Sequence, residues 1–367
     1  MSSELAAAKR LVVKVGSSSL TTPDGRFDHA RVEALAAELS ARHAQGTRIV
    51  LVTSGAIAAA LAPLGLARRP LDLETQQAAA AVGQGLLIRH YTEAFARHDV
   101  LVAQLLLTVE DVLRKTTYRN ALNTISRLFR LGVVPIVNEN DTVATHEIRF
   151  GDNDRLAALV AHLMRADALL ILSDVDGLYT SHPATPGSEL IRTVADVTSL
   201  TADTSRVGSK VGTGGMRTKV EAARIASEAG VHVVLAHADR LTDALRGADV
   251  GTHFLPVGKR RPRRLLWLAH AAETRGTITV DAGAQRAVTD RKASLLPAGV
   301  VRISGSFTEG DPVDIAGPDE QVFARGFVAY ADDELAPLLG HSSAELPEGV
   351  AYPPVVHRDL LIEVSSA

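Results

Sequence analysis

Short apolar runs rich in β-branched residues alternate with longer segments of helical pattern between residues 11 and 236. The runs that we expect to be strands span residues 11–15, 48–53, 100–107, 133–137, 168–172 and 231–236. The segments that we expect to be helices lie near residues 28–45, 75–98, 117–131, 153–165 and 216–229. Strands that are apolar on both faces and separated by helices indicate a largely parallel sheet, covered by helices on both sides.

Polar motifs follow several of these expected strands. Right-handed crossovers place the carboxyl ends of parallel strands at one edge of the sheet, where open α/β sheets bind ligands. The motifs at these ends are Lys14-Val-Gly, Thr53-Ser-Gly-Ala, Asn138-Glu-Asn-Asp and Ser173-Asp. Their convergence predicts one ligand site that is assembled from distant segments of the chain.

The sequence changes character after residue 258. Residues 259–264 form a basic run interrupted by proline, which is typical of a linker or a domain edge. Short β-like segments then follow at 277–280, 300–304, 312–315 and 321–328, and indicate a small, mostly-β domain. We expect a catalytic domain over 1–258, a linker over 259–274, a second domain over 275–357 and a C-terminal tail over 358–367.

Composition excludes several classes of function. A net charge of −3 and an aromatic content of 4% do not favour binding of nucleic acid through a global basic field or by base stacking. The absence of cysteine excludes disulfides, thiolate zinc sites and cysteine nucleophiles, and fits a reducing compartment. No apolar run of about 18 residues and no secretory signal pattern occur, so we expect a cytoplasmic protein without a membrane span.

Two segments, each with a lysine, have the chemistry of a phosphate site. Lys14 lies in an apolar run, where its charge is unfavourable unless it meets an anion, and glycine follows it. The loop 212–219, Gly-Thr-Gly-Gly-Met-Arg-Thr-Lys, precedes a helical pattern, so its N–H groups and Lys219 would face a phosphate. It lacks the Walker A spacing. An ordinary glycine-rich loop and a lysine that snorkels from a strand end are the alternatives.

The segment Gly151-Asp-Asn-Asp154 opens another helical pattern. Simple capping is one interpretation, but capping needs one such residue and three stand in a row. Asn153 would then bind a polar group of a ligand, and Asp154 would pair with the two lysines.

Three further residues fit a ligand that carries both an ammonium group and a carboxylate. Asp141 supplies an acidic group, and Ser54 and Asn138 supply neutral donors after buried strands. Polar capping of loops is the alternative for each of them.

Other chemistries find little support. Ser173-Asp174-Val-Asp-Gly177 follows a strand and suits either a magnesium ligand set or a tight Asp-Gly turn. The residue pattern does not decide which of Asp152, Asp154, Asp174 and Asp176 would contact the metal. No HExxH pair and no Gly-x-Ser-x-Gly elbow occur, which argues against a catalytic zinc site and a serine hydrolase.

Five motifs in order resemble the amino acid kinase family, and within it the members that act on glutamate. They lie at residues 12–16, 52–58, 137–144, 150–154 and 212–219. Residues 276–284 and 294–299 resemble the PUA domain that follows the kinase domain in many bacterial relatives. The resemblance implies a three-layer α/β/α sandwich with a mainly parallel central sheet, followed by a mostly-β PUA-like domain.

The resemblance also implies an activity. The expected reaction is ATP-dependent phosphorylation of the γ-carboxylate of L-glutamate to L-glutamyl 5-phosphate, the first step of proline biosynthesis, with Mg²⁺. It implies a homo-oligomer (a dimer or a tetramer) and feedback inhibition by proline. Because the product is labile, a glutamyl phosphate reductase is an expected partner.

The family roles map onto residues of this chain. The resemblance implies that Lys14, Lys219 and Asp154 are catalytic, with Asp154 organising the lysines. It assigns glutamate binding to Ser54, Asn138, Asp141 and Asn153. It assigns nucleotide binding to Lys14, to two residues at the end of the fifth expected strand, and to the loop and first turn of the last expected helix, namely Ser173, Asp174, Thr213, Gly214, Gly215, Met216, Arg217, Thr218 and Lys219.

The expected mechanism is direct in-line transfer, because a substrate carboxylate is already a nucleophile and needs no general base. One rival of another class stays open at this point. PUA-like modules often bind RNA, so the chain could be an RNA-binding or RNA-modification factor. The basic run 259–264 would then contact the RNA.

Overall fold

The computed structural model of the chain describes residues 3–22, 27–113, 115–142, 152–197, 200, 215–257, 268, 274–341 and 353–364. The chain divides into two compact units, Met1–Arg260 and Arg261–Ala367. Most of the expected linker, 259–274, lies outside the described residues. Among the described helices, none combines the length and the apolar character needed to cross a membrane.

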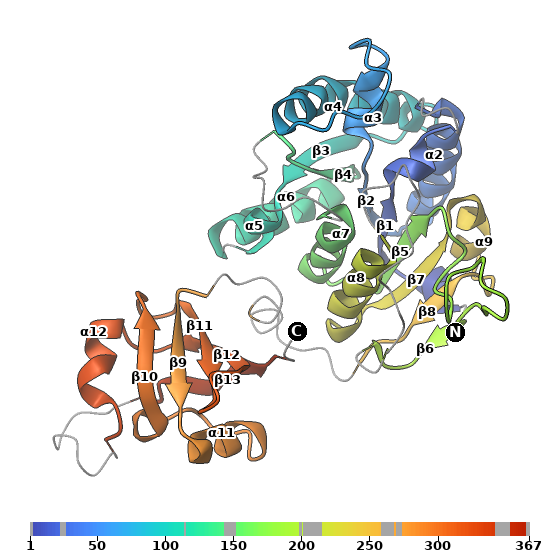
Figure 1. Cartoon of the computed structure of the whole chain (residues 1–367). Coiled ribbons are helices and arrows are strands. Elements are labelled where there is room, and N and C mark those ends of the chain that lie inside the picture. Colours follow the sequence, from blue (N-terminus) through green and yellow to red (C-terminus); the bar gives the residue numbers. More distant parts are fainter. Residues whose placement is uncertain are drawn as a thin grey trace. The chain divides into compact units, whose positions relative to one another are not determined.

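An eight-stranded sheet forms the centre of the first unit (Figure 1), with the strand order β3-β4-β2-β1-β5-β7-β8-β6. Neighbouring strands from β3 through β7 are parallel, whereas β8 runs antiparallel to β7. The strands are β1 (Arg10–Val15), β2 (Arg48–Val52), β3 (Val102–Leu107), β4 (Val134–Glu139), β5 (Ala168–Ser173), β6 (Thr193–Val194), β7 (His232–His237) and β8 (Thr252–Phe254).

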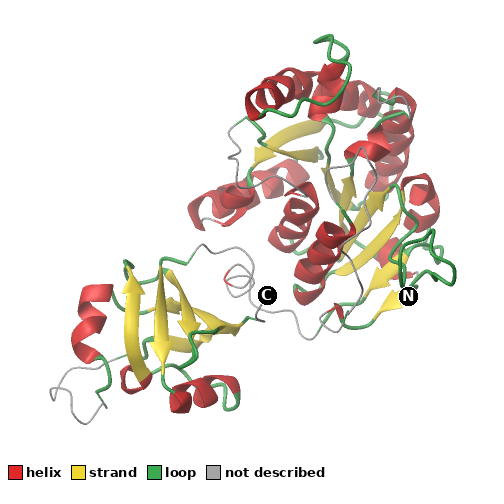
Figure 2. Cartoon of the chain, in the orientation of Figure 1, coloured by secondary structure: helices red, strands yellow, loops and turns green. Residues whose placement is uncertain are grey.

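Helices lie on both faces of this sheet, as Figure 2 shows, so the expected three-layer α/β/α sandwich is confirmed. The helices are α1 (Ser3–Ala7), α2 (His29–Ala44), α3 (Ala56–Leu61), α4 (Leu73–Ala96), α5 (Val109–Leu113), α6 (Lys115–Arg130), α7 (Asp152–Leu163), α8 (Met216–Glu228) and α9 (Leu241–Leu245). Side chains of Asp28 and Asp72 cap α2 and α4 by accepting from backbone N–H groups in the first turn.

The six strands and five helices expected in this unit are all present, with ends shifted by at most two residues. The sequence pattern did not reveal the short helices α1, α3, α5 and α9 or the short strands β6 and β8. Each has six residues or fewer, which is too short for a hydrophobic period to stand out.

The alternation of side chains along β1 determines where Lys14 points. Leu11, Val13 and Val15 are buried in one hydrophobic cluster with residues of α2 and α4. Because successive strand residues face opposite sides, Lys14 points to the other face of the sheet. Helix α7 packs against β1 there, and α8 packs against α7.

The second unit contains a five-stranded sheet in the order β10-β9-β11-β12-β13. Its elements are β9 (Gly276–Val280), α11 (Ala282–Thr289), β10 (Val300–Gly305), β11 (Pro312–Ala316), β12 (Val322–Val328), α12 (Asp332–Leu335) and β13 (Val356–Glu363). The small mostly-β domain expected here is confirmed. Strand β13 pairs with β12 through Glu363, so residues 358–363 belong to the sheet rather than to the expected tail.

Close packing of α3 against α4 depends on a glycine. A Cβ atom at Gly83 would lie 1.7 Å from the carbonyl oxygen of Ala56, far inside contact distance. Gly55, with a φ of +98°, turns the chain from β2 into α3. The two glycines together place the loop that carries Ser54 directly beside α4.

We predict that Gly83→Ala destabilises the protein by about 1–3 kcal/mol, because the added methyl group must push α4 away from α3. Gly85 lies on the same helix with no atom within 4 Å of its Cβ position. Gly85→Ala should therefore be neutral or stabilising by up to about 1 kcal/mol, because alanine is the better helix former. Urea unfolding followed by circular dichroism compares the two, and equal free-energy changes would contradict the packing argument.

Candidate active site

One buried carboxylate joins the two lysines singled out in the sequence. Lys14 Nζ lies 2.5 Å from Asp154 Oδ1, and Lys219 Nζ lies 3.4 Å from Asp154 Oδ2. All three side chains are buried, and Asp154 is only 1% exposed. They come from β1, from the first turn of α7 and from the first turn of α8, so distant segments meet at this point as the motifs predicted.

Electrostatics hold the carboxylate of this trio in its charged form. Burial by itself disfavours the ionised carboxylate of Asp154, but the attraction of Lys14 and Lys219 outweighs it and keeps the pKa of Asp154 below its ordinary value. Burial lowers the pKa of Lys14 below its ordinary value; the attraction of Asp154 opposes this shift and the repulsion of Lys219 adds to it. Two positive charges and one negative charge leave the trio with an excess of one positive charge, which suits an anionic ligand.

The first turn of α8 is hydrogen-bonded to the same carboxylate. The hydroxyl oxygen of Thr218 lies 2.9 Å from Asp154 Oδ2 and 2.9 Å from the carbonyl oxygen of Gly215, the N-cap residue of α8. The helix N-terminus, with its free N–H groups, therefore lies beside the two ammonium groups. Met216 is buried and Arg217 is exposed, while Thr213 and Gly214 lie outside the described residues.

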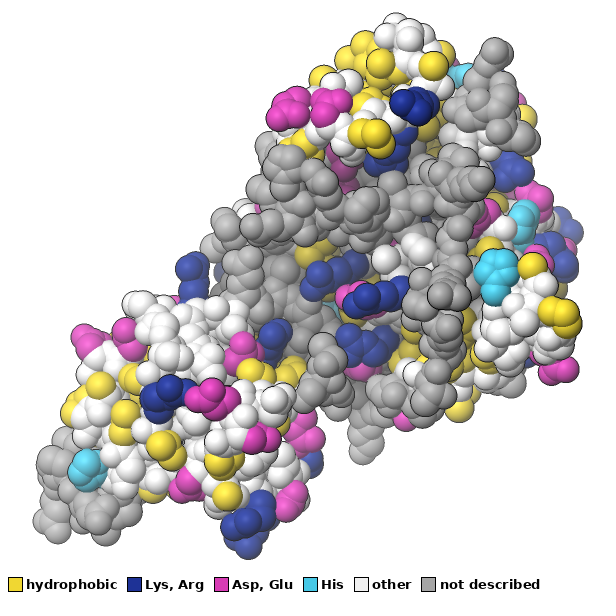
Figure 3. Space-filling model, viewed as in Figure 1, with side chains coloured by type: hydrophobic (Ala, Val, Ile, Leu, Met, Phe, Trp, Pro, Cys, Tyr) yellow, Lys and Arg dark blue, Asp and Glu magenta, His cyan; other side chains and the backbone are white. Residues whose placement is uncertain are grey.

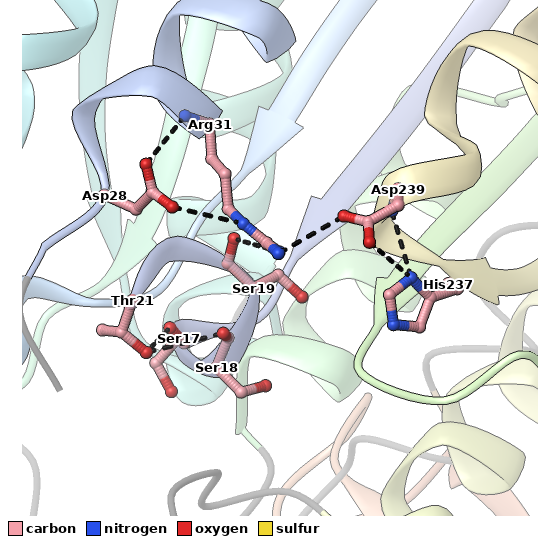
Figure 4. A network of polar contacts seen from close by, with 8 residues as sticks. All are labelled: Ser17, Ser18, Ser19, Thr21, Asp28, Arg31, His237 and Asp239. Carbon is pink, nitrogen blue, oxygen red and sulfur yellow. Dashed lines mark hydrogen bonds and ion pairs between the residues drawn. The ribbon is translucent and has the colours of Figure 1, made fainter. Parts of the chain in front are cut away.

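The turn that follows β1 is tied to two other segments by Arg31 (Figure 4). Its side chain donates to the carbonyl oxygen of Ser19 over 3.4 Å and forms ion pairs with Asp28 and Asp239, each at 3.3 Å. Ser19 belongs to the 3₁₀ turn Ser17–Leu20, and Asp239 follows β7. The loop beyond Lys14 is thus fixed to α2 and to the carboxyl end of β7.

The residues expected to bind glutamate lie at the neighbouring strand ends. Asn138 is 1% exposed at the end of β4, and its Oδ1 accepts a hydrogen bond of 3.3 Å from Asn153 Nδ2 at the start of α7. Ser54 is half-buried just beyond β2, which pairs with β4. Asp141 is half-buried in the turn after β4. The structure thus brings Asn138 and Asn153 into direct contact and places Ser54 and Asp141 beyond the ends of paired strands.

Ser173 and Asp174 lie at the carboxyl end of β5, next to β1 in the sheet. Ser173 is buried and donates a hydrogen bond of 3.0 Å to the carboxylate of Asp174, which is exposed. Asp176 is exposed, and the side chain of Asp152 lies outside the described ones. Within the described residues, no group of three or more histidine or acidic side chains forms a metal site.

Several supporting residues were not found by sequence reasoning. Gln84 of α4 accepts a hydrogen bond of 2.7 Å from Asn138. Tyr91 of α4 is hydrogen-bonded to Thr53 over 2.8 Å, beside Ser54, and burial raises the pKa of its hydroxyl. Thr218 was assigned to the nucleotide, but its hydrogen bond to Asp154 was not predicted. Gln84 and Tyr91 sit in an ordinary helical pattern, and no signal in the sequence marks their tertiary partners.

This site defines a class of protein. A mainly parallel α/β sheet that brings two buried lysines and a helix N-terminus to its carboxyl edge is suited to transfer of a phosphoryl group. Residues 9–237 match the amino acid kinase family, and residues 276–350 match the PUA domain. The chain belongs to the amino acid kinase family, and the resemblance inferred from its motifs is confirmed.

Two curated relatives of this chain carry the same name. The protein named Glutamate 5-kinase in Thermobifida fusca (strain YX) is 55% identical over 365 residues, covering 98% of this chain and 94% of the relative. The protein of the same name in Salinispora arenicola (strain CNS-205) is 56% identical over 367 residues, covering 99% of this chain and 100% of the relative. Carbamate kinase from Giardia lamblia bound to AMP-PNP has a TM-score of 0.51 at 19% identity, covering 68% of this chain and 100% of that one, and shows the shared fold.

We predict that Asp154→Asn lowers the free energy of unfolding at pH 7 by about 3–5 kcal/mol, because it leaves two buried ammonium groups without their shared carboxylate. Since the folded pKa of Asp154 is depressed, its stabilising effect is present at neutral pH. That effect begins to fade below pH about 4, the unfolded value, and is lost as the pH falls through the folded pKa. The difference between wild type and Asp154→Asn should therefore shrink in acid.

Urea unfolding at pH 7 and at several acidic values measures this difference. Asp176→Asn removes an exposed carboxylate and should change stability by no more than about 0.5 kcal/mol. A penalty for Asp154→Asn that matches the Asp176→Asn value would show that the buried trio does not depend on the charge of Asp154.

Proposed function

We propose that this chain transfers the γ-phosphoryl group of ATP to the γ-carboxylate of L-glutamate, giving L-glutamyl 5-phosphate in the first step of proline biosynthesis. The observation that carries the proposal is the convergence of Lys14 and Lys219 on Asp154 at the carboxyl edge of the sheet. The similarity to proteins named Glutamate 5-kinase, over nearly the whole length of the chain, supports glutamate as the acceptor.

The chemistry requires two anions to approach each other. Unit charges at about 4 Å repel by about 4 kcal/mol at an effective dielectric constant near 20. Lys14 and Lys219 offset this repulsion by binding oxygens of the migrating phosphoryl group, and Asp154 keeps both ammonium groups aimed at that group. Transfer is direct and in line, since the glutamate carboxylate is itself the nucleophile.

The nucleotide occupies the side of the site formed by Ser173, Asp174 and residues 215–219. The N–H groups at the start of α8 face its phosphates. Magnesium usually binds through one or two carboxylates together with substrate phosphates, so the exposed carboxylate of Asp174 fits a metal that arrives with ATP. The ion would neutralise phosphate charge during transfer.

Glutamate occupies the other side of the site. Asp141 pairs with its α-ammonium group, and Ser54, Asn138 and Asn153 supply the remaining polar contacts. Ser54, Asn138 and Asp141 follow or end β2 and β4, which lie on one side of β1 in the sheet, whereas Ser173 and Asp174 follow or end β5 on the other side.

An assay for acyl phosphate with hydroxylamine tests the proposed reaction. Incubation with ATP and glutamate should give a hydroxamate, whereas aspartate and acetylglutamate should give far less. Hydroxamate formed equally well from another acid, or none formed from glutamate, would overturn the proposed substrate.

We predict that Lys14→Ala and Lys219→Ala each lower kcat by about two orders of magnitude or more, as expected for loss of one group that stabilises the transition state. Lys292→Ala removes an exposed lysine paired with Glu363 in the second unit, and should leave kcat nearly unchanged. Steady-state kinetics measure all three. Near-normal turnover of either active-site variant would refute the role assigned to that lysine.

We predict that Asp141→Ala raises the KM for glutamate by about tenfold or more while the KM for ATP stays nearly constant, because an ion pair with the α-ammonium group is lost. Varying each substrate at saturation of the other separates the two constants. A parallel rise in both would place Asp141 outside the glutamate site.

Further parts of the proposal follow from this activity. We assign the reaction to the cytoplasm, with proline as a feedback inhibitor, a homo-oligomer (a dimer or a tetramer) as the working form and a glutamyl phosphate reductase as the enzyme that receives the labile product. These assignments rest on the family resemblance and on the chemistry of the product.

The RNA-binding alternative is less well supported. The similarity to kinases extends through both units of the chain, so the PUA-like unit does not by itself require an RNA target. Figure 3 shows acidic and basic side chains interspersed on the visible face of that unit. A salt-sensitive RNA complex that is lost on deletion of residues 274–367 would revive the alternative.

A further inference from the structure

Three side-chain amides form a chain across the proposed glutamate site. Asn138 Nδ2 donates to Gln84 Oε1 over 2.7 Å, and Asn153 Nδ2 donates to Asn138 Oδ1 over 3.3 Å. Gln84 lies in α4, Asn138 ends β4 and Asn153 is in the first turn of α7. This series of hydrogen-bonded amides thus begins on α4 and ends at Asn153, a residue assigned to the substrate.

A backbone group fixes the direction of this chain. The N–H of Glu139 donates to Asn138 Oδ1 over 2.9 Å, and a backbone N–H can only donate. The oxygen of the Asn138 amide must therefore face Glu139, and its NH₂ group must face Gln84. It follows that Gln84 presents its oxygen and that Asn153 presents its NH₂ group to Asn138.

The last amide of this series, that of Asn153, consequently presents an acceptor. Asn153 Oδ1 is buried and has no hydrogen-bond partner among the described residues. A buried amide oxygen without a donor is unfavourable, and a bound ligand can supply one. Both carboxylates of glutamate are ionised at neutral pH and accept hydrogen bonds, so the donor that glutamate offers is its α-ammonium group.

We propose that Gln84 is a positioning residue that sets the substrate specificity of the site. Its Oε1 and the N–H of Glu139 together hold the Asn138 amide in one orientation, and Asn138 in turn makes Asn153 present an acceptor to the α-ammonium group of the substrate. This inference rests on the proposed function. Without an acceptor at position 84, the buried NH₂ group of Asn138 has lost its partner and only the N–H of Glu139 holds the amide, which weakens the constraint on Asn153.

Two variants of Gln84 separate this role from simple packing. Gln84→Met keeps the length of the side chain but removes the acceptor, and should raise the KM for glutamate by about tenfold or more, with the KM for ATP changed by less than about twofold. Gln84→Glu restores an acceptor at the same reach, and its KM for glutamate should return to within about threefold of wild type.

Gln76→Met is the matched control, since Gln76 lies on the same helix and its side-chain amide donates to the carbonyl oxygen of Leu71. It should leave both KM values unchanged. The inhibition constant of glutarate, which has both carboxylates but no ammonium group, gives a second measurement. It should be the same in wild type and Gln84→Met, because the lost contact is to the ammonium group.

The outcomes separate this inference from the proposed function. If wild type forms no acyl phosphate from glutamate, the proposed function fails. If wild type is active but Gln84→Glu is no better than Gln84→Met, or if the KM for ATP and the glutarate constant rise with the KM for glutamate, then the amide chain does not direct substrate recognition and this inference alone is overturned.

Discussion

The carboxylate of Asp154, shared between Lys14 and Lys219, is the interaction on which the rest of the site depends. Burial of three charged groups is tolerable only when they pair closely, so β1, α7 and α8 must meet at one point. Thr218 binds the same carboxylate and brings the N-terminus of α8 with it. One acidic side chain therefore organises both cations and the helix end that together form the proposed phosphate-binding side of the site.

The proposed glutamate side includes the same turn of α7. Asn153 and Asp154 are consecutive, and successive residues on a helix point about 100° apart. One contacts the amide chain from Gln84 and the other contacts the lysines. The close approach of α4 to α3 at Gly83 brings the neighbouring Gln84 towards the end of β4. The first turn of α7 thus contributes to both the proposed glutamate side and the proposed phosphate side, whose relative position in-line transfer requires to be defined.

The sequence predicted the long elements and the strand-end motifs because both leave a local signature: a hydrophobic period or a polar cluster after an apolar run. Lys14, Asp154 and Lys219 could be anticipated since a buried lysine needs an anion. Gln84, Tyr91 and Arg31 could not, because their roles arise only from tertiary contacts with residues far away in the chain. Strand β13 was not predicted for a related reason, since it pairs with β12, from which residues 329–355 separate it in the sequence.

The depressed pKa of Asp154 also restricts how the site can work. A carboxylate whose negative form is stabilised by two adjacent ammonium groups is a poor base, so it cannot take a proton from a substrate near neutral pH. The excess positive charge of the trio instead favours binding of an anion. Charge placement rather than proton transfer is therefore what these residues contribute, and a nucleophile that is already ionised, such as a carboxylate, matches that contribution.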